Sequence, residues 1–459
     1  MAASIEPCRY KRVIVTFIAD GSGITCCLLQ HNKNNTEVAG SLARNSLYTL
    51  LANVSVAASN WLLLVIIAKQ FDSAQLGQFV LAISICAPAF LFASFKVRTL
   101  LVVDSAWQFK LEEYALARLL ANALVTVAIV LSNLCGWIDL SFSSLLLVLL
   151  YKWCDAWSEF CQSYMRRLHK FEVTAVSLGL RSIFTIGLVA LVALFSDSFE
   201  LLLTVWMAVA LIFALIDSWF MWRLTLSNEN AAFQWLNLLQ FAKLQRVLLF
   251  YRQHLTLAAA LVISSLFVNL PNILLSYQIS LEAAGTFATI SYFLVAGGIL
   301  INSLSQVGTP KLSELYRQGN YIGFVTLVKK LCLVGIVIGV SGFVVALFFG
   351  AYFLRMFYNQ DIAQYYDVLN WVMLAAAVRY IYIFLGTALA AVQQFHVQTK
   401  IYASGLLVLL ISSYFLVALN GLTGAAQAML LATLVELSLF IIVSRQSLKQ
   451  AFSKAQDAT

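Results

Sequence analysis

The stretch LSFSSLLLVLLYKWCDAWSEFCQSYMRRLHK, residues 140–170, places charged side chains inside a segment that otherwise looks like a membrane helix. At about 100° per residue, its polar residues fall within an arc of about 100°. They are Lys152, Asp155, Glu159, Gln162, Ser163, Arg166 and Lys170. A charge at the bilayer centre costs about 2.5–3.5 kcal/mol on insertion scales, so such a stripe usually faces a hydrated cavity or a partner. The pattern predicts a helix that lines a pathway, with a solvated extension as the alternative for its outer half.

The composition of the whole chain indicates a polytopic membrane protein. Of its 459 residues, 61% are hydrophobic and 11% are charged, whereas about 25% of residues in a soluble domain are charged. Apolar runs of spanning length recur between short polar gaps, which is the pattern of membrane helices and not of ten-residue barrel strands. We therefore expect an all-α fold.

Twelve spans are expected, in two sets of six. They lie at roughly 44–68, 77–98, 114–134, 140–160, 172–195, 199–223, 254–277, 284–307, 323–349, 365–391, 398–418 and 423–444. The expected domains are a cytoplasmic N-terminal tail (1–41), an N-lobe (42–223), a cytoplasmic linker (224–253), a C-lobe (254–445) and a cytoplasmic C-terminal tail (446–459). Six spans in each half allow two lobes related by a pseudo-two-fold axis along the membrane normal.

A weak internal repeat supports duplication. Gln70, Gly77 and Phe79 recur as Gln278, Gly285 and Phe287 at a constant offset of 208 residues. Both copies fall between the first and second spans of their halves, as a duplicated unit requires.

The basic residues indicate how the chain is oriented. Of the 29 Lys and Arg residues, 26 lie in or near segments on the side of the N-terminus, Lys69 and Arg355 lie on the other side, and Arg379 lies in mid-span. The positive-inside rule then places both termini in the cytoplasm. This distribution also argues against nucleic acid as a partner, because the basic residues form no single soluble face. No Cys or His spacing resembles a metal site, and no cofactor is expected.

Several ionisable residues lie well inside the predicted spans. Arg181 and Asp217 are at similar depth, so they could pair with each other or with Lys152 and Asp155. Arg379 and Glu436 each lie midway through a span and could form a second pair.

The alternative to structural pairing is that these groups bind a ligand. An Arg side chain offers a diphosphate a planar fork of paired donors, which makes Arg379 and Arg181 the best candidates for an anion site. Glycan hydroxyls suit amide side chains such as that of Asn60.

Several segments together resemble the lipid-linked oligosaccharide flippases, which export O-antigen and related polysaccharide repeat units. The segments are NSLYTLLAN (45–53), AKQFDSAQLGQF (68–79), Ala87-Pro88, RTLLVVD (98–104), residues 151–167 and PKLSELY (310–316). This family shares a superfamily with multidrug and toxin extruders and lipid II flippases. The resemblance implies two six-helix lobes around a cavity with alternating access, and it adds Arg98 and Asp104 as cavity candidates.

The resemblance also implies the substrate and the setting. The expected substrate is a polyprenyl-diphosphate-linked glycan, and the expected location is the bacterial inner membrane. A polysaccharide polymerase and a chain-length regulator are candidate partners besides membrane lipid.

Two other functions compete with a flippase. A cation-coupled multidrug exporter would commonly carry an acid in its first span, where this chain offers Asn53 and Asn60. A membrane-embedded glycan polymerase or glycosyltransferase would usually need a large outer loop, whereas the outer loops expected here are short. A non-enzymatic transporter is therefore favoured.

The charge asymmetry generates a topology prediction. Reporters fused after residues 136, 197 and 358 should be active only if they work outside the cytoplasm, because these positions fall in loops that the positive-inside rule places there. Activity of a cytoplasmic reporter at any of the three positions would contradict the layout.

Overall fold

The computed structural model describes residues 24–103, 109–226 and 241–457, and these residues are organised as helices. The helices are α1 (Ile24–Gln70), α2 (Ser73–Ala93), α3 (Val97–Val103), α4 (Leu111–Leu134), α5 (Phe142–Arg167), α6 (Phe171–Phe195), α7 (Phe199–Leu226), α8 (Phe241–Gln278), α9 (Leu281–Arg317), α10 (Tyr321–Phe357), α11 (Gln360–Ala363), α12 (Tyr366–Ala391) and α13 (Phe395–Asp457). Residues up to Leu47 and residues from Tyr48 form two separate units. The following description concerns the second unit.

Ten helices within the described residues are long and apolar enough to cross a membrane. Counting α5 and counting α13 as two spans brings the number to the predicted twelve. Helix α5 is not among the ten because of its charged stripe, and α13 merges two helices across Gly421, whose backbone is not helical (φ 57°, ψ −129°). The predicted all-α, multi-pass fold is confirmed.

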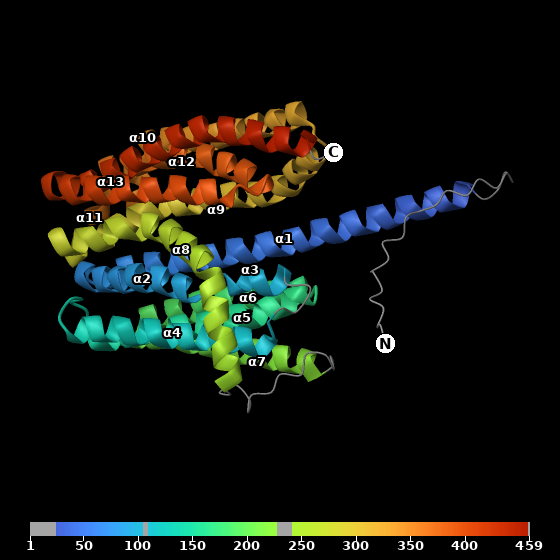
Figure 1. The fold of residues 1–459 in the computed structure, drawn as a ribbon. Coiled ribbons are helices and arrows are strands. Elements are labelled where there is room, and N and C mark those ends of the chain that lie inside the picture. Colours follow the sequence, from blue (N-terminus) through green and yellow to red (C-terminus); the bar gives the residue numbers. More distant parts are fainter. Residues whose placement is uncertain (1–23, 104–108, 227–240, 458–459) are drawn as a thin grey trace. The chain divides into compact units, whose positions relative to one another are not determined.

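The helices of the second unit form two lobes (Figure 1). In the N-lobe, α5 packs against α2 and α7, and α6 packs against α7. In the C-lobe, α12 packs against α9, α10 and α13. Helix α2 joins the lobes, because it packs against both α8 and α9.

The predicted repeat is visible in the helix boundaries. Helix α1 ends at Gln70 and α8 at Gln278, and α2 begins at Ser73 and α9 at Leu281, so both boundaries recur at the offset of 208 residues found in the sequence.

The repeat-related glycines touch each other where α2 crosses α9. A Cβ atom added to Gly285 would lie 3.0 Å from the backbone nitrogen of Gly77, and one added to Gly77 would collide with the carbonyl oxygen of Leu281. Equivalent positions of two repeats approach each other only near the axis that relates them. Gly77 and Gly285 therefore mark the pseudo-two-fold axis.

Polar contacts join the lobes near this crossing. The Lys69 ammonium donates to the carbonyl oxygen of Met356 (3.1 Å), and the Trp61 indole donates to the Tyr358 hydroxyl (3.0 Å). We call this the closed end of the second unit. A cavity of about 540 Å³ lies there, and Thr286 is among its lining residues.

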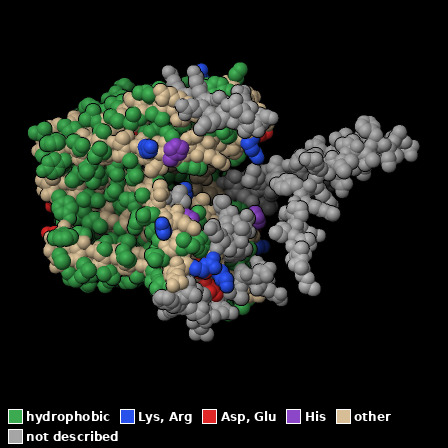
Figure 2. Space-filling view, viewed as in Figure 1, with side chains coloured by type: hydrophobic (Ala, Val, Ile, Leu, Met, Phe, Trp, Pro, Cys, Tyr) green, Lys and Arg blue, Asp and Glu red, His purple; other side chains and the backbone are tan. Residues whose placement is uncertain are grey.

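Helix α8 also contacts the N-lobe at the opposite end. Its first part crosses α4 (Figure 1), where Arg246 pairs with Glu113 (2.9 Å) and the Tyr251 hydroxyl donates to the carbonyl oxygen of Ala117 (2.6 Å). Residues 241–253 of the predicted linker are thus helical and continuous with the seventh span. Figure 2 shows hydrophobic side chains over most of the left part of the visible face, whereas the Lys, Arg and His side chains seen there lie mainly in the middle of the view.

The glycine crossing generates a prediction. Gly77→Val should weaken closure, because overpacking a tight contact costs about 1–3 kcal/mol. A cysteine introduced at Thr286, in an otherwise cysteine-free chain, should then react faster with a membrane-impermeant thiol reagent applied at the closed end. Gly179→Val is the control, because nothing lies within 4 Å of a Cβ atom added there. Equal reactivity in the two variants would contradict the prediction.

Candidate functional site

A polar cavity of about 360 Å³, here called the N-lobe cavity, lies between α1, α5 and α6, with α9 of the C-lobe on its far side. Its polar lining residues are Asn53, Asn60, Arg98, Asp155, Ser158, Glu159, Gln162, Arg166, Arg181 and Tyr292. The charged stripe of α5 therefore does line a cavity from Asp155 to Arg166. Of the outer half, for which a solvated extension was the alternative, Glu159, Gln162 and Arg166 line the cavity, whereas Ser163 does not and Lys170 is exposed.

Both acids of the stripe are paired with arginines from other helices. The Arg181 guanidinium of α6 lies 2.9 Å from the Asp155 carboxylate. Glu159 is paired with Arg118 of α4 (2.5 Å) and lies 3.7 Å from Arg98. Of the pairings left open by the sequence, Arg181 with Asp155 is the one that the structure forms.

A break between α2 and α3 places Arg98 at the cavity. Phe95 and Lys96 have positive φ angles (42° and 57°), which L-residues rarely adopt and which cost about 1–2 kcal/mol each. The break is stabilised locally, because the Ser94 hydroxyl accepts from the Lys96 amide (3.3 Å) and the Phe95 ring packs 4.6 Å from that of Tyr251.

Arg166 differs from the other arginines of the cavity. It is half-buried and lines the cavity, yet it forms no ion pair with any residue that the structure describes. Three arginines and two carboxylates line this cavity. It therefore has an excess of positive charge and a guanidinium available to an anion.

Asp217 lies behind the cavity wall and not in the lining. Its carboxylate is fully buried and accepts hydrogen bonds from Ser158, from Ser177 (2.7 Å) and from the Gln162 amide (2.9 Å). Two of these donors, Ser158 and Gln162, come from α5. Asp217 thus holds the polar face of α5 toward α6 and α7.

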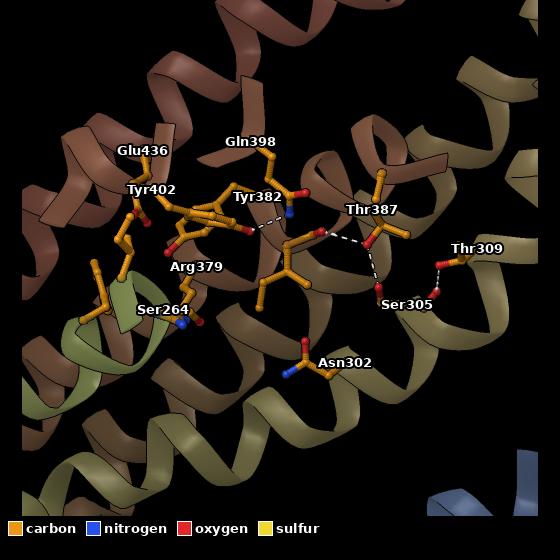
Figure 3. A pocket seen from close by; sticks show the side chains of 14 residues that line it. Ser264, Asn302, Ser305, Thr309, Arg379, Tyr382, Thr387, Gln398, Tyr402 and Glu436 are labelled. Atoms are coloured by element: carbon orange, nitrogen blue, oxygen red, sulfur yellow. Dashed lines mark hydrogen bonds between the residues drawn. The ribbon is translucent and has the colours of Figure 1, made fainter. Parts of the chain in front are cut away.

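A second cavity, of about 350 Å³ and here called the C-lobe cavity, lies between α8, α9, α12 and α13 (Figure 3). Arg379 and Glu436, the two mid-span charges of this lobe, both line it. They form no ion pair, although both belong to the described residues. The Arg379 guanidinium instead lies 4.6 Å from the centroid of the Phe267 ring, in a cation–π contact.

The other sequence-predicted residues fall into three groups. Asn60 and Arg98 line the N-lobe cavity, as expected of candidates. Lys152 is not among its lining residues, and its ammonium lies 5.8 Å from the Tyr151 ring centroid. Asp104 lies outside the described residues.

Sequence reasoning did not select several residues that the structure brings to the cavities. Arg118 was overlooked because it lies near the start of its predicted span, where a basic residue is ordinary. Tyr382, Gln398 and Tyr402 line the C-lobe cavity, but a tyrosine or glutamine in a membrane helix gives no signal of its own. Among the described residues, no group of three or more His, Cys, Asp or Glu side chains could hold a metal ion.

No protein-family model matches the chain. A curated relative, the capsular polysaccharide biosynthesis protein CapF of Staphylococcus aureus, is 29% identical over 404 residues, which is 86% of this chain and 97% of the relative.

Solved structures with a similar fold belong to membrane transporters. The lipid II flippase MurJ in an inward closed conformation matches with a TM-score of 0.69 and 15% identity over 89% of each chain. A mutant of the Vibrio cholerae MATE transporter VcmN matches with a TM-score of 0.63 and 14% identity over 91% of this chain and 99% of that one. The fold expected from the sequence resemblance is therefore confirmed.

The buried hydrogen bonds of Asp217 generate a stability prediction. Asp217→Ala should lower the free energy of unfolding in detergent by at least about 3 kcal/mol, because three buried donors lose their acceptor at about 1–3 kcal/mol each. Thermal unfolding followed by fluorescence would measure this change. Asp139→Ala, at an exposed loop position, is the matched control and should change stability little. Similar stability of the two variants would exclude a structural role for Asp217.

Proposed function

We propose that this chain is a transporter that moves a polyprenyl-diphosphate-linked oligosaccharide from the cytoplasmic to the outer leaflet by alternating access. The observation that carries the proposal is the N-lobe cavity. Its lining is mostly polar, it holds more arginines than carboxylates, and α9 of the C-lobe closes its far side. The similarity to CapF and the fold shared with MurJ support a substrate of this class.

The arginines of the N-lobe cavity are suited to the diphosphate. A guanidinium makes paired, charge-assisted hydrogen bonds with phosphate oxygens, and these are about twice as strong as bonds between neutral groups. Arg98 lies near Glu159 and Arg181 is paired with Asp155. Arg166, by contrast, forms no ion pair with a described residue, so its guanidinium can bind a ligand. We therefore assign Arg166 as the main diphosphate contact, with Arg181 and Arg98 beside it.

The two lobes supply the movement. Residues 42–223 and 254–445 would rock against each other as rigid bodies about the glycine crossing, so that the cavity opens alternately to each side. The closed end, with its Lys69–Met356 and Trp61–Tyr358 contacts, would be the outer side. Both termini and the linker 224–253 would then be cytoplasmic, in a bacterial inner membrane.

In this mechanism the chain itself would catalyse no reaction. The cavity residues would bind and release the substrate, and bond formation would fall to partners such as a polysaccharide polymerase and a chain-length regulator. A cation-coupled multidrug exporter is the second candidate, favoured by the fold shared with the MATE transporters. Helix α1 presents Asn53 and Asn60 to the cavity, and these amides carry no charge for coupling to a cation.

The experiment is transport in proteoliposomes that contain the lipid-linked glycan isolated from the native membranes. Arg166→Gln should slow translocation at least about tenfold, since hydrogen bonds to charged groups contribute about 1.5–3 kcal/mol. Arg166→Lys should recover only part of the rate, because an ammonium cannot present paired donors.

Arg252→Gln is the matched control, because Arg252 is exposed on α8 and does not line the cavity. Translocation by the Arg166→Gln variant at the rate of the unchanged protein would exclude the assigned contact. Extrusion of a lipophilic cation driven by an ion gradient, without glycan translocation, would favour the second candidate.

A further inference from the structure

The C-lobe cavity differs from the N-lobe cavity in charge. Its lining contains one basic and one acidic residue, Arg379 and Glu436, so it is neutral overall. The remaining polar lining residues are uncharged: Ser264, Asn302, Ser305, Thr309, Tyr382, Thr387, Gln398 and Tyr402. Figure 3 shows these side chains arranged around a common space. They come from α8, α9, α12 and α13. A neutral polar lining of this kind suits a ligand rich in hydroxyl groups.

Two buried polar atoms of this cavity lack a hydrogen-bond partner among the described residues. They are Oε2 of Glu436 and the hydroxyl of Tyr382, in side chains that are each 1% exposed. The Tyr382 hydroxyl and the Glu436 carboxylate are close enough to interact with each other, but neither of the two atoms forms a hydrogen bond of normal geometry, so each keeps capacity for a further partner. A ligand hydroxyl placed between the two groups would use that capacity.

The surrounding residues hold these groups in place around the cavity. The Phe267 ring positions the Arg379 guanidinium, and the Gln398 amide donates to the Tyr402 hydroxyl (3.3 Å). Gly405 leaves room for the acid, since a Cβ atom there would collide with the Glu436 carboxylate. The spacing of donors and acceptors is thus set before a ligand arrives.

We propose that the C-lobe cavity binds an uncharged sugar ring of the glycan while the N-lobe cavity holds the diphosphate. This inference rests on the proposed function. A sugar hydroxyl donates to one group and accepts from another, so it can bridge the Glu436 carboxylate and the Arg379 guanidinium. An acidic sugar would be repelled by Glu436 and an amino sugar by Arg379, so the cavity selects a neutral or N-acetylated ring.

The same charges argue against placing the diphosphate in the C-lobe cavity. A diphosphate there would bring two anionic groups beside the Glu436 carboxylate with a single arginine to offset them, whereas the N-lobe cavity offers three arginines. Arg379 and Arg181 were the two sequence-based candidates for the diphosphate, but the cavity of Arg379 is better matched to the sugar.

The test compares two probes on the purified full chain in lipid nanodiscs. One is polyprenyl diphosphate without sugar, and the other is the glycan-bearing lipid isolated from native membranes. Tyr382→Phe and Glu436→Gln should each weaken binding of the glycan-bearing probe about tenfold, or about 1.4 kcal/mol, and leave the sugar-free probe unchanged. Arg166→Gln should weaken both probes.

Tyr164→Phe is the matched control, because the Tyr164 hydroxyl is also buried and forms no hydrogen bond with a described residue, but lies outside the C-lobe cavity. It should leave both affinities unchanged. Equal loss for the two probes in the Tyr382→Phe variant, no loss for either, or equal affinity of the unchanged protein for both probes would overturn the sugar site and leave the proposed function standing. Failure of the unchanged protein to bind either probe would refute the proposed function and the sugar site together.

Discussion

The cost of placing a charge in a bilayer explains how the interior of this protein is arranged. A charged side chain in a membrane helix must meet water, an opposite charge or a hydrogen-bonding partner. On α5, Asp155 and Glu159 meet arginines from three other elements, α3, α4 and α6, and each contact ties a separate helix to the stripe. The same charges that make α5 a poor membrane helix by composition therefore assemble the N-lobe around it.

Much of the fold could be predicted from the sequence, because the patterns that indicate membrane helices lie within single segments of the chain. Spanning length and the offset of 208 residues depend only on the order of residues, and the helices follow them closely. The site was predictable in part for the same reason. A charge inside an apolar run is visible in the sequence, so Asp155, Arg181, Arg379 and Glu436 could be selected, and all four line cavities.

What could not be predicted depends on which helices become neighbours. Arg118 looked like a residue at a membrane surface, yet it is 3% exposed because α4 brings it against Glu159. Arg379 and Glu436 looked like partners because they lie at equal depth, but depth is only one of three coordinates, and the Phe267 ring holds the guanidinium elsewhere. Asp217 looked like a cavity residue, and only the packing of α5, α6 and α7 shows it buried behind Ser158 and Gln162.

The two lobes share a repeat but not a chemistry, and this difference has a physical consequence for transport. A duplicated scaffold offers a cavity in each half, and later divergence can tune each cavity separately. If both cavities were strongly cationic, a diphosphate lipid would bind in either and the substrate would have no defined orientation. One cationic cavity and one neutral, hydroxyl-rich cavity give the two ends of an amphipathic substrate different partners. Because each lobe then holds a different part of one molecule, the substrate itself bridges the lobes, and its binding free energy depends on how far they have rocked.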